Sequence, residues 1–221
     1  MKAISKLAVE DGHVRRNPAG SLATEKAASE GTKRAMEKGD VVKAIGALEL
    51  RERLIFKLAT SCGMRPGEIF GLTWADVHDN HLEVVRRVYR GDVDSPKTRR
   101  SIRKVALPTG VAADLTEWKS TAQSTAEDGW VFASEKATQL SRDNVWRRNI
   151  QPALVNVELG WANFQVMRRT HSTLARRAGA DPKVVADQMG HGLGVNLNEY
   201  AVAQLDQLAD AVTKLETTVV N

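Results

Sequence analysis

Two arginines, a histidine and a tyrosine in this chain are of the types that can attack a phosphodiester and stabilise the charge that develops. Tyr200 stands nine residues after His191, Arg168 lies one short predicted helix upstream, and Arg65 belongs to an earlier Gly-Met-Arg-Pro-Gly-Glu segment. Attack on a phosphodiester without a metal needs fixed cations around the phosphoryl oxygens. A free phenol has a pKa of about 10 and is a poor nucleophile at neutral pH. We therefore expect Arg65, Arg168 and His191 to favour the tyrosine oxyanion as it forms.

The composition describes a globular protein that does not rely on cysteine chemistry. The chain has 221 residues, 42% of them hydrophobic, which is enough to fill a core. It contains no apolar run long enough to cross a bilayer, and its first residues lack the apolar stretch of a secretory signal, so we expect a cytoplasmic protein. A single cysteine, Cys62, excludes an internal disulfide and a cysteine-rich zinc site, and we expect it to be a core residue.

Basic residues are clustered along the chain, which is more informative than the modest net charge of +5. Any one cluster is equally well explained as a solvated face, but together they favour a polyanionic partner. The clusters are Arg86-Arg87 with Arg90, the five basic residues between Lys97 and Lys104, Arg147-Arg148, Arg168-Arg169 and Arg176-Arg177.

The elements that must position the reactive residues begin after a polar segment. Residues 1–18 are typical of a helix end followed by a turn, and residues 19–39 have the composition of a linker. From Asp40, a good N-cap, the apolar spacing predicts a helix up to Gly63, with a possible interruption at residues 50–53. Pro66 suits the first position of a further helix, 66–74, which would leave Arg65 at its N-terminus.

Two segments rich in β-branched residues predict an antiparallel sheet, residues 82–89 and 101–107, joined by a polar turn over residues 91–96. Helical patterns dominate the remainder, so the predicted class is mainly α with a small antiparallel β-sheet (α+β). The further predicted elements are helices over 111–120, after the N-cap Ser141, over 164–178 and over 182–189 with Asp181 as cap, and a short strand at 131–132.

Four segments in this order resemble the motifs of the tyrosine recombinase, or phage integrase, family, over about residues 40–210. The resemblance implies the tyrosine recombinase catalytic-domain fold. The segments are Gly63-Met64-Arg65-Pro66-Gly67-Glu68-Ile69 with Leu72-Thr73-Trp74-Ala75-Asp76-Val77, then Pro96-Lys97-Thr98, then Met167-Arg168-Arg169-Thr170-His171-Ser172-Thr173, and finally Met189-Gly190-His191 with Tyr200.

The resemblance assigns a role to each arginine. Arg65, which taken alone could be a structural residue pairing with Glu68, becomes a phosphate ligand that Glu68 orients. Adjacent arginines cannot share one helical face, so we expect either Arg168 or Arg169 to face solvent, and the motif selects Arg168 as the second phosphate clamp. The resemblance also gives His191 a hydrogen bond to a phosphoryl oxygen or a role in placing Tyr200.

In the same family a lysine on the β-hairpin is the general acid that protonates the departing 5′ oxygen, and Lys97 matches it. Arg99, Arg100, Arg103 and Lys104 are rival cations that only their spacing from the turn distinguishes. Tyr200 competes with one other tyrosine, Tyr89, which we expect to be packed in a strand.

One site residue departs from the family pattern. Gln165 stands where the family has the histidine of His-x-x-Arg, and an amide can donate a hydrogen bond but cannot exchange a proton near pH 7. A positioning role for Gln165 survives, with His171 as a minor candidate for compensation. A metal site built from His171, Asp187 and His191 matches no zinc motif, so we expect no metal and no cofactor.

The resemblance implies a site-specific recombinase or integrase that cleaves and rejoins DNA through a 3′-phosphotyrosyl intermediate, without ATP. The implied partners are a double-stranded recombination site and further copies of the chain in a tetrameric synapse, with a monomer when free, at the nucleoid and not at a membrane. A type IB topoisomerase and a non-catalytic DNA-binding regulator are the alternatives. Further candidate DNA contacts are Arg99, Arg100, Arg147, Arg148 and Arg169.

Both ends of the chain carry further expectations. Family members usually have a helical core-binding domain before the catalytic one, and residues 1–18 resemble only its end. At the other end, apolar residues recur at three- and four-residue intervals through residues 201–221, which predicts an amphipathic helix. Its apolar stripe could dock on its own domain or, as the resemblance implies, on a neighbouring protomer.

Overall fold

The computed structural model describes residues 8–17, 34–89, 91–94, 102–122 and 124–190, and the chain divides into two units, residues 1–33 and 34–221. In the first unit residues 8–10 are helical, and the backbone then turns, with the N–H of Gly12 donating to the carbonyl of Val9 at 3.1 Å. The turn agrees with the predicted helix end. The predicted site residues all lie in the second unit.

A helix that is buried along most of its length forms the centre of the second unit. This helix, α3 (Leu50–Thr60), contacts α2 (Lys38–Ala47), α4 (Pro66–Ile69), α5 (Thr109–Thr121) and α8 (Phe164–Arg177). A helix buried all round is expected where several neighbours pack on it. Its fully buried side chains include Leu54, Ile55, Phe56, Leu58 and Ala59.

The single helix predicted from Asp40 to Gly63 is in fact two helices, because the backbone is extended at Leu48 and Glu49. Asp40 is not the N-cap of α2. That position belongs to Glu37, and the Asp40 carboxylate accepts a hydrogen bond from the Glu37 backbone N–H at 3.1 Å. Asp40 therefore stabilises the helix start from within its first turn, as the reciprocal half of a capping box does.

Among the described residues the strands form two antiparallel pairs, so the predicted small antiparallel sheet is present but divided. Strand β1 (His81–Val84) pairs with β4 (Arg103–Ala106), and β2 (Arg87–Tyr89) pairs with β3 (Asp92–Asp94), which lies where a turn was predicted. The first strand ends before Arg86, whose guanidinium donates to Asp76 and to the carbonyl of Gly71. Because the Arg86 side chain points inward, the backbone does not continue the pairing of β1 with β4 beyond Val84.

The remaining helices largely begin where their caps predicted. The Ser141 hydroxyl accepts from the Asn144 N–H ahead of α6, and the Asp181 carboxylate accepts from the Lys183 N–H at 2.7 Å ahead of α9. The predicted helix 66–74 stops at Ile69. The elements not yet given are η1 (Trp74–Asp76), α6 (Arg142–Val145), the π-helix η3 (Trp146–Ile150), α7 (Gln151–Asn156) and α9 (Pro182–Met189).

No strand forms at the buried residues Val131 and Phe132. Trp130 instead makes one isolated bridge with Thr73, and the Val131 N–H donates to the Leu72 carbonyl at 2.9 Å. Val131 and Phe132 look like a strand in the sequence because both are apolar core residues. The backbone there makes a single β-bridge and no continuous ladder.

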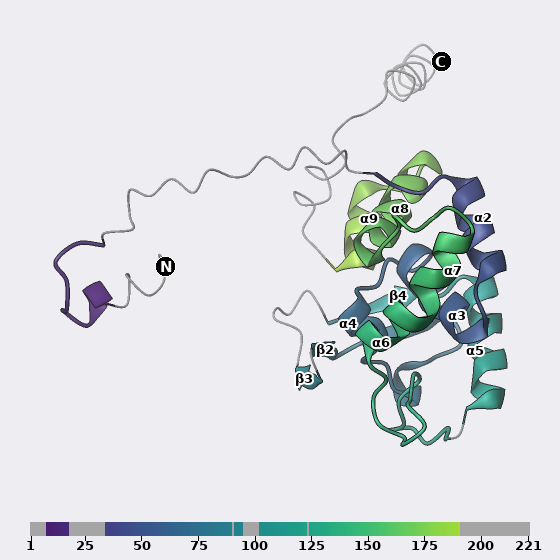
Figure 1. Ribbon diagram of the computed structural model, residues 1–221, viewed down its shortest axis with the longest axis horizontal. Coiled ribbons are helices and arrows are strands. Elements are labelled where there is room, and N and C mark those ends of the chain that lie inside the picture. Colours follow the sequence, from purple (N-terminus) through teal and green to yellow (C-terminus); the bar gives the residue numbers. More distant parts are fainter. Residues whose placement is uncertain (1–7, 18–33, 90, 95–101, 123, 191–221) are drawn as a thin grey trace, which may run out of the picture. The chain divides into compact units, whose positions relative to one another are not determined.

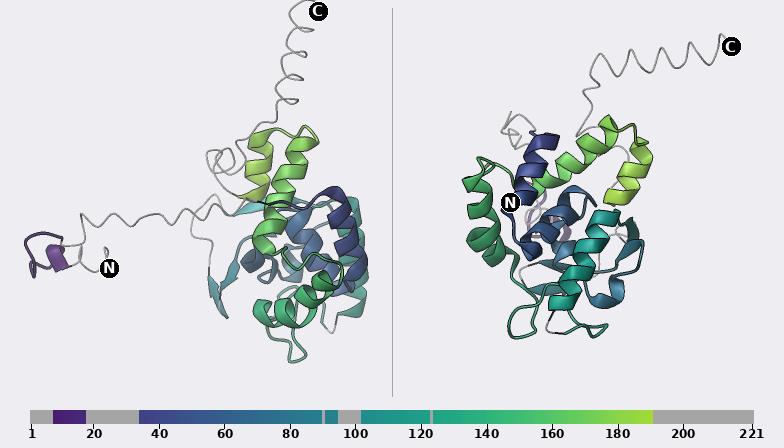
Figure 2. Two further views of the ribbon diagram at one scale, coloured as in Figure 1. Left: turned by 45° about the horizontal axis from the view of Figure 1, so that its top comes forward. Right: turned by 90° about the vertical axis from the view of Figure 1, so that its right-hand side faces the viewer.

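Among the described elements of the second unit, α8 and α9 come latest in the sequence and pack on elements from earlier in the chain. Helices α8 and α9 lie side by side in Figures 1 and 2, α8 packs on α3, and α9 packs on β4. The class is mainly helical with small antiparallel pairs of strands, as predicted. Within the described part of the chain, every helix is too short or too polar to cross a membrane.

Candidate active site

Arg65 is held at the start of α4 by the carboxylate of Glu68. Arg65 occupies the N-cap position and Pro66 the first helical position, so the helix begins where the sequence predicted. Glu68 accepts from the Arg65 backbone N–H at 2.8 Å and from its Nη1 atom at 2.8 Å. The Arg65 side chain remains 38% exposed although Glu68 is 5% exposed, so the guanidinium keeps a surface that a ligand can reach.

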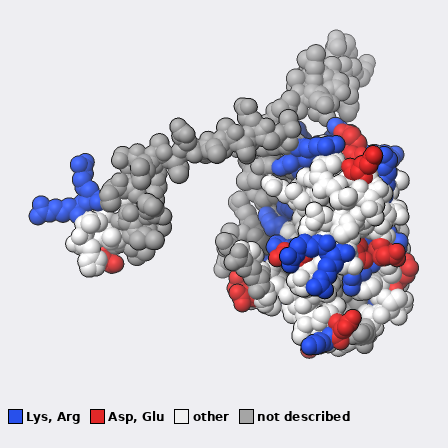
Figure 3. Space-filling view, viewed as in Figure 1, with Lys and Arg blue, Asp and Glu red and all other residues white. Residues whose placement is uncertain are grey.

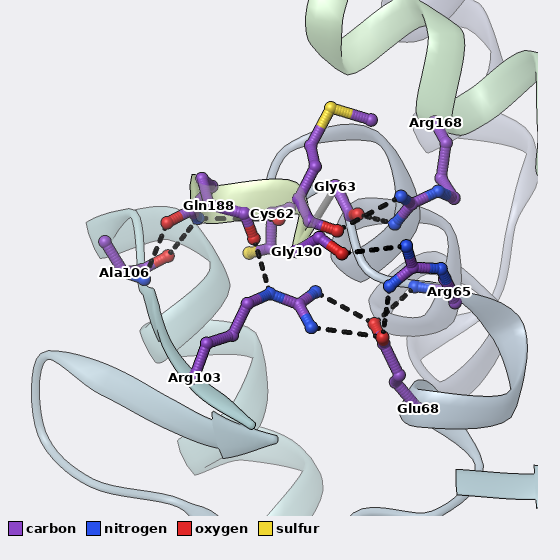
Figure 4. Close-up of polar contacts among 10 residues, drawn as sticks. Cys62, Gly63, Arg65, Glu68, Arg103, Ala106, Arg168, Gln188 and Gly190 are labelled. Atoms are coloured by element: carbon purple, nitrogen blue, oxygen red, sulfur yellow. Dashed lines mark hydrogen bonds and ion pairs between the residues drawn. The ribbon is translucent and has the colours of Figure 1, made fainter. Parts of the chain in front are cut away.

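The second predicted clamp, Arg168, projects from α8 toward the backbone turn at Met189 and Gly190. Arg168 donates to the Gly63 carbonyl through Nη1 and to the Met189 carbonyl through Nη2, the latter at 3.2 Å. Arg65 donates through Nη2 to the next carbonyl, that of Gly190, at 3.0 Å. Figure 4 shows the two guanidinium groups converging on this turn, which ends α9. The structure thus brings together residues that are about one hundred positions apart in the sequence.

Gly63 fits this junction because no side chain could be placed there. Its φ is +67°, and an added Cβ would lie 2.7 Å from Cδ2 of His171. Nδ1 of His171 lies 3.2 Å from the Thr60 carbonyl oxygen. His171 therefore packs against the loop that precedes Arg65. This packing is a structural reason for a histidine at this position that does not require an acid–base role.

Sequence reasoning missed the importance of Arg103, which it treated as one of several rivals of Lys97. The Arg103 side chain is 7% exposed, and its Nη1 and Nη2 atoms donate to the two oxygens of Glu68 at 3.0 and 2.9 Å. The alternation of β4 contained a signal, because a residue two positions from the buried Val105 lies on the same face of the strand.

The same arginines control the charge of Glu68. Burial alone would raise the pKa of this carboxyl, but the hydrogen bond and positive charge of Arg103, together with those of Arg65, hold the pKa below its ordinary value. Glu68 is therefore ionised at neutral pH. One carboxylate shared by two guanidinium groups leaves a net positive charge at the site.

Gln188 is a second residue that sequence reasoning missed. Its side-chain amide pairs with the backbone of Ala106, accepting from the N–H at 3.1 Å and donating to the carbonyl at 3.2 Å. The backbone carbonyl of Gln188 accepts from Nε of Arg103 at 2.8 Å. These contacts join the end of α9 to β4, and no local pattern in the sequence indicates them.

Two of the cations that rival Lys97 lie beside carboxylates of the protein. Arg103 is committed to Glu68, and Lys104 points to the opposite face of β4, where its Nζ lies 3.5 Å from Glu83. Neither therefore fits the role of general acid. The predicted site residues Lys97, Arg99, Arg100, His191 and Tyr200 lie outside the described residues, and their roles stay predictions.

The remaining predicted site residues lie around α8 and η3. Gln165 is exposed on the first turn of α8, three residues before Arg168. Arg169 does not face solvent as expected: it is half-buried, and its Nη1 donates to the Arg34 carbonyl at 3.1 Å. Arg147 and Arg148 are exposed on η3. Figure 3 shows basic and acidic side chains intermixed on the face it displays.

Several basic clusters are partly explained by ion pairs within the protein. Arg86 pairs with the buried Asp76, and Nη1 of Arg177 lies 2.6 Å from Glu37. These pairs show why clustering along a sequence overstates the charge available to a polyanion.

Two single residues complete the comparison with the sequence. Tyr89 is 54% exposed at the end of β2 and is not packed as predicted, so it must be controlled for in any assay of a tyrosine nucleophile. Cys62 is a free, buried cysteine as expected. Burial raises the pKa of its thiol to about 12, so it stays protonated and is not a nucleophile at neutral pH.

One group of the described residues has metal-ligand types close together: His78, His81 and Glu83. The two imidazoles stack with centroids 4.5 Å apart, and the Lys104 ammonium already lies beside the Glu83 carboxylate. The Nε2 atoms of His78 and His81 lie 3.9 and 3.8 Å from the same Glu83 oxygen that Lys104 approaches, so the group is described as a polar surface cluster. Asp187, from the metal alternative, pairs with Lys183.

Comparison with known proteins places this geometry in context. A model of the phage integrase family matches residues 34–205. A tyrosine recombinase XerC-like protein of Caldanaerobacter subterraneus subsp. tengcongensis is 26% identical over 192 residues, covering 75% of this chain and 49% of that protein. The ICEBs1 integrase of Bacillus subtilis is 25% identical over 162 residues, covering 64% and 43%. The chain therefore spans about half the length of the curated relatives it matches.

Solved structures agree in fold. The Tn1549 transposon integrase, in complex with a circular intermediate DNA, superposes with a TM-score of 0.77 at 19% identity, covering 96% of this chain and 76% of that one. A lambda integrase dimer bound to a core site gives a TM-score of 0.61 at 17% identity, covering 92% and 72%. Both likenesses extend over nearly the whole chain and show a shared fold.

Proposed function

Because the chain belongs to the phage integrase family, we propose that it is a site-specific DNA recombinase that cleaves and rejoins strands through a 3′-phosphotyrosyl intermediate. The observation that carries the proposal is the convergence of Arg65 and Arg168 on the turn at Met189 and Gly190. The next residue along the chain is His191, and Tyr200 follows nine positions later. Two fixed guanidinium groups are therefore delivered to the segment that carries the proposed nucleophile.

The chemistry assigned to these residues is a phosphoryl transfer. The Tyr200 oxygen attacks the scissile phosphorus, the phenol gives up its proton, and the bond to the 5′ oxygen breaks. Lys97 gives a proton to that departing oxygen, and Arg65, Arg168 and His191 stabilise the charge on the phosphoryl oxygens. A 5′ hydroxyl of another strand then attacks the phosphotyrosine, so the bond energy is conserved without ATP.

Arginine suits both clamp positions because its charge does not titrate and its planar group offers several N–H donors at once. Each clamp uses part of this donor set on the protein. The Arg65 guanidinium is oriented by Glu68 on one side and by the Gly190 carbonyl on the other. Its exposed remainder is then available to a phosphate without a search through side-chain conformations.

The proposed partners are a duplex recombination site of a mobile element and further copies of this chain in a tetrameric synapse, acting in the cytoplasm at the nucleoid. The proposed domains are the end of a core-binding domain at residues 1–18, a linker at 19–39 and the catalytic domain at 40–210. The segment 201–221 is proposed as a helix that packs on its own domain or on a neighbouring copy.

Covalent capture tests the function without knowledge of the target sequence. The full chain is incubated in EDTA, without ATP, with end-labelled duplexes of random sequence that each carry a single nick, and the products are separated on a denaturing gel. A cleaving enzyme retards a fraction of the label, and protease removes the shift. Sequencing of the captured duplexes then supplies one defined substrate for later assays.

The matched variants are Tyr200→Phe and Tyr89→Phe. The proposal predicts that Tyr200→Phe binds the captured duplex but forms no adduct, because only the nucleophilic oxygen is removed, while Tyr89→Phe behaves as wild type. An adduct that persists in Tyr200→Phe and disappears in Tyr89→Phe would reassign the nucleophile.

Other outcomes point to other functions. Binding without any adduct would support a non-catalytic regulator, which the glutamine at position 165 makes conceivable because it cannot exchange a proton. Relaxation of supercoiled plasmid without joining of two sites would support a type IB topoisomerase.

A further inference from the structure

The guanidinium of Arg103 fills the space between three segments that meet at the site. It projects from β4, and its Nη1 and Nη2 atoms form a two-point contact with the carboxylate of Glu68 on α4. Its third donor, Nε, faces the Gln188 carbonyl near the end of α9. Figure 4 shows the group directed inward, below Gly190 and beside Glu68. It is therefore built into the site's interior and does not belong to a basic surface.

Gly190 rests directly on this guanidinium. The backbone of Gly190 is left-handed, with φ of +67°, and an added Cβ would lie 2.7 Å from Nη1, 2.8 Å from Cζ and 2.9 Å from Nε of Arg103. The absence of a side chain lets the Gly190 backbone approach the guanidinium group closely. The position of the Gly190 carbonyl thus depends on where Arg103 is.

These contacts connect Arg103 to both groups that orient Arg65. Among the described residues, the side chain of Arg65 donates to Oε1 of Glu68 and to the carbonyl of Gly190. Arg103 also donates to Oε1 of Glu68, and its guanidinium lies against the backbone of Gly190. Arg65 and Arg103 do not need to touch for the position of one to determine the position of the other.

We propose that Arg103 is a positioning residue for the strand-cleavage reaction, a role that rests on the proposed function: it holds Glu68 and Gly190 in place and, through both, aims Arg65 at the scissile phosphate. Arg103 also preserves the charge of Arg65. Glu68 carries one negative charge, and without Arg103 that charge would be balanced by Arg65 alone, leaving a neutral pair. With Arg103 present, the group of three retains one positive charge for the phosphate.

The geometry requires arginine and not merely a cation. Two parallel donors match the two oxygens of a carboxylate, and a third donor in the same plane reaches the Gln188 carbonyl. A lysine ammonium would keep the charge but lose this planar arrangement. Charge and position can therefore be separated by substitution, with Arg103→Lys removing the fork and Arg103→Met removing both.

The test compares these variants with a second internal arginine that pairs with a buried carboxylate. Arg86 donates to Asp76, to the Thr73 hydroxyl at 2.9 Å and to the Gly71 carbonyl at 3.3 Å, but its contacts do not include the partners of Arg65. Arg86→Met is thus a control for the loss of an internal ion pair. For each protein, unfolding in urea gives the folded fraction, and fluorescence anisotropy gives the Kd for the captured duplex. The rate of adduct formation is then measured at saturating DNA under single-turnover conditions.

We expect Arg103→Met to lower the rate at saturating DNA by tenfold or more while the Kd changes by less than about threefold, because Arg103 acts on the reacting phosphate only through Arg65. Arg103→Lys should recover part of the rate, since the charge returns. Arg86→Met should reduce stability but, per folded molecule, keep a rate within about twofold of wild type.

The outcomes distinguish this role from the function on which it depends. If wild type forms no adduct with any duplex, the proposed function fails and the role of Arg103 fails with it. If wild type reacts and Arg103→Met reacts equally fast per folded molecule, or loses no more rate than Arg86→Met, the positioning role alone is wrong. Should Arg103→Met not fold, Arg103→Lys decides: a rate equal to wild type overturns the role, and a lowered rate at unchanged Kd supports it.

Discussion

Replacing Glu68 by glutamine measures how strongly one carboxylate holds the site together. The carboxylate accepts four hydrogen bonds, two from Arg103 and two from Arg65. Glutamine keeps the shape and one acceptor oxygen but removes the charge, which leaves the buried Arg103 without a counter-charge. Removing one partner of a buried ion pair costs about 3–5 kcal/mol. Because one acceptor remains, we expect a loss near the lower end, about 3 kcal/mol at pH 7.

The pH dependence of this loss gives a second signature. The pKa of Glu68 lies below its ordinary value of 4.5, since Arg103 and Arg65 outweigh the opposing effect of burial. A carboxyl whose pKa is lowered by folding contributes stability above its unfolded-state pKa and loses that contribution as the pH falls through the folded-state pKa. The advantage of wild type over Glu68→Gln is therefore complete at pH 7 and shrinks progressively below about pH 4.5.

Urea unfolding followed by tryptophan fluorescence measures the free energy of unfolding in steps from pH 7 to pH 3.5. The matched control is Glu83→Gln, because Glu83 pairs with Lys104 at the surface and a pair of this kind contributes about 0–1 kcal/mol. A loss in Glu68→Gln that equals the loss in this control, or one that stays constant from pH 7 to pH 3.5, would refute the view that Glu68 is the electrostatic centre of the site.

Two further substitutions test the neighbouring groups. Gly190→Ala should destabilise the protein by about 1–2 kcal/mol for its left-handed backbone alone, and adduct formation should fall further because the new Cβ displaces Arg103; unchanged urea unfolding would contradict the close approach. Lys97→Ala should slow cleavage strongly on ordinary DNA but much less on a duplex whose 5′ leaving oxygen is replaced by sulfur, since a thiolate leaves without a proton; equal losses in gel-monitored cleavage would mean that Lys97 only binds phosphate.

Much of the local structure could be predicted because its causes are local. The starts of α6 and α9 follow from Ser141 and Asp181, whose side chains satisfy backbone N–H groups within three residues. The start of α4 follows in the same way from Pro66, and it fixes Arg65 at a helix end. Each of these interactions involves residues within one helical turn, so it can be recognised from a short stretch of sequence.

The arrangement of the candidate site could be predicted only in part, because its contacts are remote in sequence. The grouping of Arg65 with Arg168 came from family motifs, and the pairing of Glu68 with Arg65 came from helical spacing. The hydrogen bonds of Arg103 to Glu68 and of Gln188 to Ala106 join residues 35 and 82 positions apart. Charge alone favoured a DNA-facing role for such an arginine, whereas burial turned it inward to a carboxylate.

The predictions that Tyr89 is packed and that residues 82–89 form one continuous strand were wrong for a related reason. β-branched residues and aromatic side chains predict strand structure, but which side chains are covered depends on neighbours from elsewhere in the chain. In this protein Arg86 turns inward between the two strand pairs, and the second pair leaves Tyr89 exposed.

The junction at Gly190 also determines when the candidate site of a newly made chain can form. Arg168 reaches back to Gly63 across 105 residues, and Arg65 meets Gly190 across 125. Contacts over such separations form late, because the intervening chain must first be ordered. A chain still being synthesised can pair Arg65 with Glu68 before α9 has been made, but the Met189 and Gly190 carbonyls on which Arg168 and Arg65 converge are then not yet present. The candidate site is therefore complete only after α9 has been made and has packed on α8 and β4.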